Sequence, residues 1–198
     1  MARTQAADYE QRRGAILEEA AKLFATHGFL GASVVELAKA CKVSKSLLYH
    51  YYPSKESILF DVMDSHIHAL TGVAEATLAG EAPPTERLRA LTRAFMQLYS
   101  GASGHHKVLL NELDNLSREQ RDLVVDHQRR LLRLVEHVLL EIEPSLERDR
   151  TRLRPVVMLF FGMINWTHNW FNPSGALSQT QVADMAVDIL IGGLHSIK

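Results

Sequence analysis

The chain has 198 residues, a formal net charge of −1, 46% hydrophobic residues and 23% charged residues, which is the composition of an ordinary globular protein with ample length for a core. Its single cysteine, Cys41, excludes an internal disulfide framework and suits a reducing compartment. The first fifteen residues contain no apolar export segment, and the most apolar run, 155–171, is shorter than the ~20 apolar residues of a membrane span. We therefore expect a cytoplasmic protein without a membrane helix.

The N-terminal part of the chain predicts three helices in close succession. The first covers about 9–27 and is stopped by Gly28. Ser33 and Glu36 form the S-x-x-E pattern of a capping box, which marks the start of a second helix. A tight turn follows, and Ser44 can cap the third helix. Two short helices joined by such a turn are typical of a helix-turn-helix.

The remainder of the chain predicts longer helices and no strand. The expected segments are 55–78, a helix that ends at Gly101, a short apolar piece over 108–113, 117–143, 155–171 and a last helix after Ser178. Ser117 with Gln120 and Ser178 with Gln181 repeat the capping-box pattern. Pro155 is expected in the first turn of its helix. The sequence therefore predicts an all-α fold with about nine helices.

The third helix carries small, basic and aromatic side chains in positions suited to a DNA groove. Lys45 and Ser46 lie at its N-terminus, where base edges are usually contacted, and Leu47 and His50 can also reach into the groove. Phosphate contacts are expected from Ser33, Tyr49, Tyr51 and Lys55, and the helix cap Ser44 is also expected at the DNA. Packing is the alternative role for Tyr49, and an idle surface position is the alternative for Lys45. The first 60 residues have net charge +2 and the rest −3, which is the expected sign for DNA binding.

This segment resembles the DNA-binding signature of the tetracycline-repressor (TetR) family of bacterial regulators. The matching residues are Ser33, Val43-Ser44-Lys45, Leu48-Tyr49, Tyr52 and Ser54-Lys55-Glu56, in order and spacing over about twenty-five positions. The chain departs from the family at Lys42, where Gly is usual, and at Ser46 and Leu47. A left-handed Lys42 would cost on the order of 1 kcal/mol. Leu47 lacks the hydroxyl of the usual Thr but could contact a thymine methyl group, so the departures leave the operator sequence open.

The resemblance implies two domains and a regulatory function. Residues 1–54 would form a three-helix, helix-turn-helix DNA-binding domain, and residues 55–198 a larger domain for effector binding and dimerisation. The expected function is a dimeric repressor that binds a palindromic operator and is released by a hydrophobic effector. An all-helical ligand-binding protein or enzyme, with a structural helix-turn-helix, is the alternative from another class.

The last two helices predict a subunit interface. Residues 155–171 are apolar on nearly every side, and a helix of this kind must be covered all round. The last helix has a broad apolar face made of Val182, Met185, Ala186, Ile189 and Leu190. We expect these two helices to pair with a second copy in a four-helix interface, as the resemblance also implies. The alternative is that both are core helices of a monomer.

A hydrophobic effector site is expected in the C-terminal domain. Its lining is predicted to include Phe95, Tyr99, Leu109, Leu113, Leu131, Val135, Phe161, Trp166 and Trp170. The run from Asn165 to Ser178 resembles a segment in regulators that respond to acyl-CoA thioesters, and Arg130 is a candidate for binding the phosphates. A solvated helix face is the alternative for Arg130, and packing in the core or in a dimer is the alternative for the two tryptophans. A sensor of drugs or aromatic compounds is also open, because Glu112 and Asp114 could attract a cationic drug.

The sequence shows no pattern for catalysis, cofactor binding or metal binding. His66 and His68 are two residues apart, so on a helix they point to different sides, and His105-His106 are adjacent. There is no Gly-rich phosphate loop and no cysteine cluster. We therefore expect neither an enzyme nor a cofactor or metal site.

Overall fold

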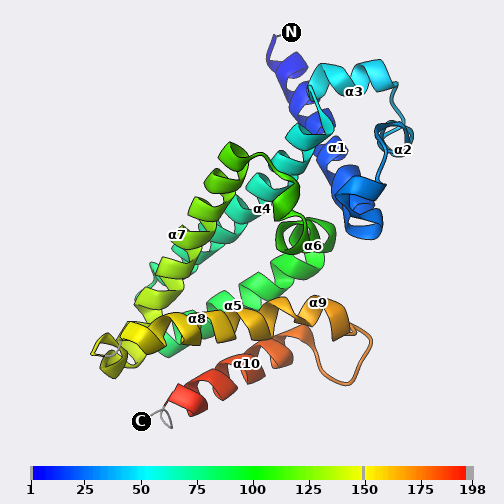
Figure 1. Ribbon diagram of the computed structural model, residues 1–198. Coiled ribbons are helices and arrows are strands. Elements are labelled where there is room, and N and C mark those ends of the chain that lie inside the picture. Colours follow the sequence, from blue (N-terminus) through cyan, green and yellow to red (C-terminus); the bar gives the residue numbers. More distant parts are fainter. Residues whose placement is uncertain (1, 149, 195–198) are drawn as a thin grey trace. The chain divides into compact units, whose positions relative to one another are not determined.

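The computed structural model describes residues 2–148 and 150–194, with side chains from residue 8 onward. Within these ranges the chain is helical and contains no strand, so the predicted all-α fold is confirmed. The helices are α1 (Ala2–Gly31), α2 (Val34–Ala40), α3 (Lys45–Tyr51), α4 (Lys55–Leu78), α5 (Pro84–Gly101), α6 (Ser103–Asn111), α7 (Arg118–Ile142), α8 (Arg150–Asn165), α9 (Thr167–Trp170) and α10 (Gln179–Leu194), with single 3-10 turns η1 (Leu113–Asn115) and η2 (Pro144–Glu147) (Figure 1).

The helices form two compact units. The first contains Met1–His68 with Ala102–Val125, and the second contains Ala69–Gly101 with Asp126–Lys198. The long helices α4 and α7 each contribute to both units. The first unit includes α6 because α6 packs closely against α1: a Cβ atom added to Gly104 would lie 3.0 Å from the backbone of Ala21.

The first unit begins with a longer helix than the sequence predicts. α1 starts at Ala2 rather than near residue 9. The sequence did not predict this start because the polar first turns give no apolar periodicity. Gly28 has φ 72 and ψ 161, so the helix is broken where the sequence predicts its end. The chain then turns, and the ring of Phe29 packs edge-on against Phe24 at 5.4 Å.

The starts of α2 and α3 follow the predicted caps. The Ser33 hydroxyl accepts a hydrogen bond from the Glu36 amide at 3.1 Å, and the Glu36 carboxylate accepts one from the Ser33 amide at 2.9 Å. At the next helix the Ser44 hydroxyl accepts from the Leu47 amide at 3.0 Å. Leu48 is buried beneath α3 and fixes its inner face. These contacts span three residues, so the local sequence is enough to predict them.

The turn between α2 and α3 holds Lys42 in a left-handed conformation, with φ 56. Replacing Lys42 by glycine is expected to raise the free energy of unfolding by about 1 kcal/mol, because glycine adopts this φ without a Cβ clash. Chemical denaturation measures the change. Lys39→Gly is the matched control: it lies on α2, and an exposed helical glycine should lower the stability by a similar amount. A Lys42→Gly variant no more stable than the parent would contradict the strain.

In the second unit, one face of α5 is buried in the core. Leu88, Leu91, Phe95 and Tyr99 are buried, and Gly101 ends the helix. The Ser178–Gln181 capping box opens α10: the Ser178 amide donates to the Gln181 side chain at 2.8 Å, and the Gln181 amide donates to the Ser178 hydroxyl at 3.2 Å. α10 packs along α5.

Two expectations for the region 155–171 are wrong. α8 begins at Arg150, so Pro155 lies inside the helix and not in its first turn; the buried side chains of Leu153 and Val156 hold the helix on both sides of it. The helix also ends at Asn165 instead of continuing to Phe171. The Thr167 hydroxyl donates to the Ile164 carbonyl at 2.5 Å, a local bond that competes with helix continuation, and the short α9 follows. No helix in the described part of the chain has the length and hydrophobicity to cross a membrane.

Candidate functional site

The predicted base-reading residues lie together on α3. Lys45, Ser46 and His50 are exposed, while Leu47 is half-buried over the buried Leu48. The helix is thus anchored from below and presents polar side chains outward. This is the arrangement that a recognition helix needs in a major groove.

Aromatic rings lie beside these polar groups. The Lys45 ammonium is 5.8 Å from the ring centre of Tyr49, a cation–π contact one turn along the helix. The Tyr51 ring lies 4.8 Å from that of Tyr9 on α1, centre to centre, and 5.6 Å from that of His50. Tyr49 is exposed, so its side chain is free to reach DNA. Tyr51 is half-buried, and its contact with Tyr9 packs α3 against α1.

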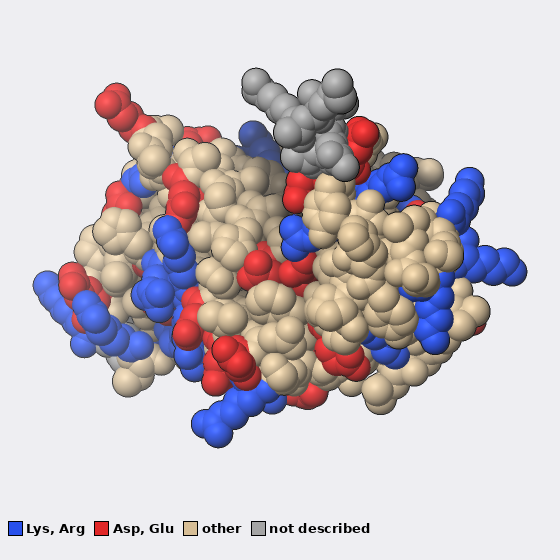
Figure 2. All heavy atoms as spheres, turned by 90° about the horizontal axis from the view of Figure 1, so that it is seen from above, with Lys and Arg blue, Asp and Glu red and all other residues tan. Residues whose placement is uncertain are grey.

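Positively charged side chains lie among negatively charged ones rather than in one basic patch (Figure 2). Figure 2 shows Lys and Arg side chains interspersed with Asp and Glu on the face that it presents. The net charge of residues 1–60 is only +2. The expected attraction to phosphates therefore depends on individual groups, such as the exposed caps Ser33 and Ser44 at the starts of α2 and α3, rather than on a broad basic face.

Lys55 has a structural role that the sequence did not reveal. Its ammonium donates hydrogen bonds to the carbonyl oxygens of Phe29 at 2.8 Å and Ala32 at 2.9 Å. It also lies 4.2 Å from the centre of the Phe29 ring. These partners are 26 and 23 residues away in the sequence, so no local pattern points to them. The ammonium has a third proton, and the phosphate contact of Lys55 stays a prediction.

Lys55→Met is therefore expected to lower the free energy of unfolding by about 2 kcal/mol, because two carbonyl groups lose a charged donor. Methionine keeps much of the apolar stem, so the loss reports the hydrogen bonds. Lys45→Met is the control at an exposed position of α3 and is expected to change stability by less than about 0.5 kcal/mol. Equal stabilities of the two variants in chemical denaturation would contradict the structural role of Lys55.

The structure brings some of the predicted effector residues together. Phe95, Tyr99 and Phe161 lie in the core of the second unit, where the Phe95 ring centre is 6.1 Å from that of Tyr99 and 6.2 Å from that of Phe161. Leu131 and Val135 of α7 are buried in the same unit. Arg130 lies beside them on α7, and its guanidinium pairs with Glu75 at 2.5 Å.

Other predicted effector residues are placed differently. Leu109 and Leu113 belong to the first unit, where Leu109 is buried and Leu113 half-buried. Trp166 and Trp170 are 64% and 55% exposed, and neither is buried among the core rings of the second unit. Their contact with an effector stays a prediction, beside the alternative that they pack at a subunit interface.

The second unit contains a cavity of about 250 Å³ at a neighbouring place. It is lined by Glu75, Leu78, Ala79, Arg87, Leu134, His137, Val138 and Glu141. Arg87 donates to Glu141 at 2.5 Å and to the carbonyl of Leu78 at 2.9 Å. The cavity is one turn along α7 from Leu131 and Val135, and it has an apolar floor with paired charges beside it.

Three histidines form a buried cluster where α4 meets α6 in the first unit. His66 Nε2 lies 3.2 Å from His106 Nδ1, and the ring centres of His66 and His105 are 6.2 Å apart. Burial, and secondly the charge of His105, lowers the pKa of His66 from 6.5 to about 4. Burial also lowers the pKa of His105, although the Glu18 carboxylate 3.9 Å away opposes the shift. His66 and His105 are therefore uncharged at pH 7.

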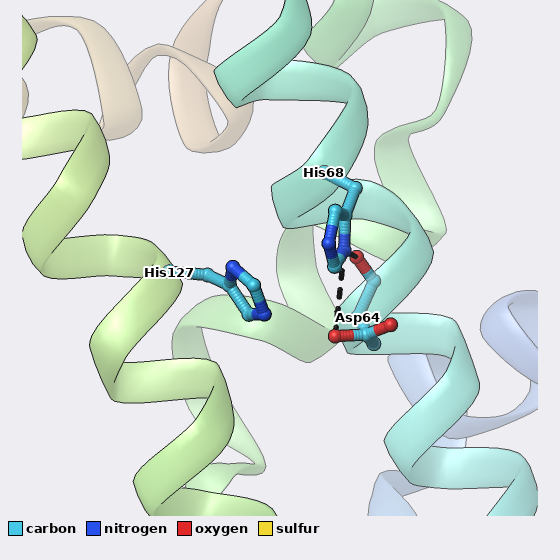
Figure 3. Close-up of side chains that lie close together, drawn as sticks. All are labelled: Asp64, His68 and His127. Atoms are coloured by element: carbon cyan, nitrogen blue, oxygen red, sulfur yellow. Dashed lines mark hydrogen bonds and ion pairs between the residues drawn. The ribbon is translucent and has the colours of Figure 1, made fainter.

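The expectation that His66 and His68 point to different sides is confirmed. His66 is buried, whereas His68 is exposed and turns back to its own helix. Its Nδ1 atom lies 2.8 Å from the Asp64 backbone oxygen and 3.4 Å from the Asp64 carboxylate (Figure 3). The two imidazoles cannot share a ligand from these positions.

Comparison with known sequences gives matches over both ends of the chain. The family described as bacterial regulatory proteins, tetR family, matches residues 16–62, and the tetracyclin repressor-like C-terminal domain matches residues 81–194. The HTH-type transcriptional repressor KstR2 of Mycobacterium tuberculosis is 26% identical over 200 residues, which cover 96% of this chain and 96% of KstR2.

Solved structures give similar results. A TetR-family transcriptional regulator from Bordetella parapertussis is 35% identical and superposes with a TM-score of 0.88, over 94% of this chain and 97% of that regulator. AibR, solved in complex with isovaleryl coenzyme A and operator DNA, is 30% identical with a TM-score of 0.78, over 91% of this chain and 98% of AibR.

Proposed function

The chain belongs to the tetR family of bacterial regulatory proteins, and on this premise we propose that it is a homodimeric repressor released from a palindromic operator by a hydrophobic effector. It is a DNA-binding transcription regulator and not an enzyme. In the proposed division, residues 1–54 read DNA, and residues 55–198 bind the effector and the second copy. The observation that carries the proposal is the capped helix α3, which exposes Lys45, Ser46 and His50 above the buried Leu48.

Individual contacts with DNA follow from these positions. We assign base reading to Lys45, Ser46, Leu47 and His50, which occupy one short helix. Phosphate binding is assigned to the helix starts and to the aromatic edge, through Ser33, Ser44, Tyr49, Tyr51 and the remaining proton of Lys55. Two copies related by a twofold axis would read two half-sites.

The proposed dimer surface lies on α8 and α10. Met158 and Leu159 of α8 and Met185 and Ile189 of α10 are large apolar side chains that are roughly half or more exposed. Monomeric proteins seldom leave such a surface uncovered, and a second copy supplies matching helices. This set supports homodimerisation through the last two long helices.

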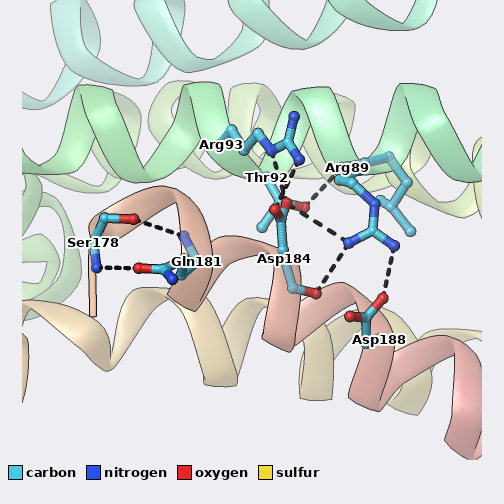
Figure 4. Close-up of polar contacts among 8 residues, drawn as sticks. Arg89, Thr92, Arg93, Ser178, Gln181, Asp184 and Asp188 are labelled. Carbon is cyan, nitrogen blue, oxygen red and sulfur yellow. Dashed lines mark hydrogen bonds and ion pairs between the residues drawn. The ribbon is translucent and has the colours of Figure 1, made fainter. Parts of the chain in front are cut away.

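α10 is fixed on its other side to α5 of the same chain. Arg93 binds Asp184 through two hydrogen bonds of 2.7 Å, and Arg89 binds Asp188 at 2.6 Å (Figure 4). The hydrogen bond from Arg93 lowers the pKa of Asp184 below its usual value. Gln179, at the start of α10, donates to the Met96 carbonyl and to the Ser100 hydroxyl of α5. The apolar residues of α10 are thereby held in place for a partner.

An acyl-CoA thioester is the effector that the site supports best. The rings of Phe95, Tyr99 and Phe161 and the apolar floor of the adjacent cavity suit an acyl chain, and Arg130 could exchange Glu75 for a phosphate. The solved complex of AibR with isovaleryl coenzyme A supports this class of ligand. The carboxylates proposed for a cationic drug have partners of their own: Glu112 accepts from Asn115, and Asp114 pairs with Arg121, so such a drug would likewise have to displace a partner.

The proposed function is tested by fluorescence anisotropy with the DNA upstream of the gene for this protein. Binding is measured alone and with isovaleryl-CoA or a long-chain acyl-CoA, and free CoA and the free carboxylic acids are the controls. Tight, salt-sensitive binding that is lost only with a thioester is the expected result. A coupling free energy of only ~1.4 kcal/mol between effector and DNA binding already gives a tenfold loss of DNA affinity. DNA binding that none of these ligands changes would overturn the acyl-CoA effector.

A further inference from the structure

We propose that Arg13 is a positioning residue for DNA recognition, because its guanidinium fixes the C-terminal end of α3 to α1 and α4. The inference rests on the proposed reading of operator DNA by α3. The partners of Arg13 are 39 and 48 residues away in the sequence, and they meet only in the folded first unit.

The three side chains come from three different helical segments. Arg13 Nε, on α1, donates to the Tyr52 hydroxyl at 3.1 Å. Another nitrogen of the same guanidinium donates to the Asp61 carboxylate on α4. The guanidinium carbon also lies 5.7 Å from the centre of the Tyr52 ring. One arginine thus connects α1, α4 and the residue that directly follows α3.

Tyr52 is the fixed point of this contact. It is 4% exposed, and its backbone amide caps α3 by donating to the Leu48 carbonyl at 3.0 Å. Burial raises the pKa of the Tyr52 phenol, and the hydrogen bond to Asp61 raises the pKa of Arg13. The phenol therefore stays neutral and the guanidinium charged at physiological pH, so the contact persists there.

The orientation of α3 depends on few anchors. The helix has seven residues, and Leu48 is its buried residue. Tyr52 supplies a second buried anchor at the end and adds to the packing of Tyr51 on Tyr9, and these contacts together fix the direction in which Lys45 and His50 point. Without the bond to Arg13, α3 keeps its hydrophobic anchor but has more freedom to rotate about it. Base contacts require hydrogen-bond geometry and are lost first, whereas phosphate contacts tolerate such motion.

The contact also joins α3 to the helix that leads out of the DNA-reading part of the chain. Asp61 lies on α4, which continues from Lys55 to Leu78. Through Arg13, Asp61 therefore links the end of α3 to α4.

The experiment compares Arg13→Gln, Asp61→Asn and Tyr52→Phe with the unaltered protein. Anisotropy titrations use the upstream DNA and a scrambled duplex of equal length, at several salt concentrations. Each variant is expected to bind the upstream DNA about tenfold more weakly, the effect of one charged hydrogen bond. Binding of the scrambled duplex should stay within about twofold, and the salt slope should not change. The double variant Arg13→Gln/Asp61→Asn should lose no more than either single variant, because both changes break one contact.

Arg12→Gln is the matched control, because Arg12 is the exposed neighbour of Arg13 on α1 and the charge change is the same. An equal loss on both DNAs in Arg13→Gln, with a salt slope smaller by about one, would show a phosphate contact and overturn the inference. Unchanged operator binding by Tyr52→Phe and Asp61→Asn would overturn it as well; these milder variants decide the matter if Arg13→Gln melts at a lower temperature. An unaltered protein that binds both DNAs equally would overturn the proposed function itself.

Discussion

Ile189→Glu is expected to convert the protein into a 22.3 kDa monomer and to weaken operator binding by at least about a hundredfold. Ile189 is 62% exposed on the apolar face of α10, and Leu159 on α8 is 66% exposed. A glutamate at this position would have to be buried without a partner, on both sides of a twofold interface, which costs several kcal/mol. Operator affinity falls with the dimer, because two half-sites bound by one dimer gain from effective concentration and a monomer does not.

Light scattering at micromolar concentration measures the mass, and anisotropy measures the affinity. Leu123→Glu is the matched control: Leu123 is an exposed apolar residue of α7 in the first unit, and the same change there should leave the mass at twice that of one chain. Leu159→Glu should repeat the effect of Ile189→Glu from the other helix. Dimers that persist in both interface variants would show that the copies associate elsewhere.

Acid is expected to destabilise the fold by roughly 3 kcal/mol between pH 7 and pH 4, as the histidine cluster is forced to accept protons. The pKa of His66 is about 4 in the folded chain and near 6.5 in an unfolded one. As the pH falls through 6.5, His66 is protonated in the unfolded chain but stays neutral in the folded one. The free energy of unfolding therefore decreases. The loss continues until the pH reaches about 4, where the folded chain also becomes protonated. The lowered pKa of His105 acts in the same direction.

Chemical denaturation at a series of pH values measures this slope. His66→Gln is expected to flatten the curve, because glutamine keeps a polar group near His106 and does not titrate. His27→Gln is the control at an exposed position of α1 in the same unit and should leave the slope unchanged. A slope in His66→Gln equal to that of the parent protein would show that the cluster does not control the acid sensitivity.

The parts of the fold that sequence predicted well depend on contacts within one turn of helix. The caps of α2, α3 and α10 join residues three positions apart, so Ser33, Ser44 and Ser178 mark helix starts in the sequence. At Lys42 the resemblance pointed to a position where Gly is usual, and the residue is left-handed there, with φ 56. Helix starts without a strong local signal, at Ala2 and Arg150, were missed.

The candidate site was predictable where it is carried by α3 alone. The contacts of Lys55 with the end of α1, and of Arg13 with Tyr52 and Asp61, join distant residues and carry no local pattern. The tryptophans illustrate a second limit. Apolar composition predicted that Trp166 and Trp170 are covered, but it could not distinguish a pocket in one chain from an outer surface.

In the proposed dimer, the ion pairs between α5 and α10 would affect how two copies come together. Exchange of C-terminal helices between subunits would require Arg93 to release Asp184 and Gln179 to leave α5 before any bond with the partner forms. The swapped dimer would form the same bonds again and no additional ones. This route therefore has a kinetic barrier and no gain in stability. We therefore expect each chain to complete its own fold first and the finished subunits to dock, which leaves the dimers free to trade partners as intact chains.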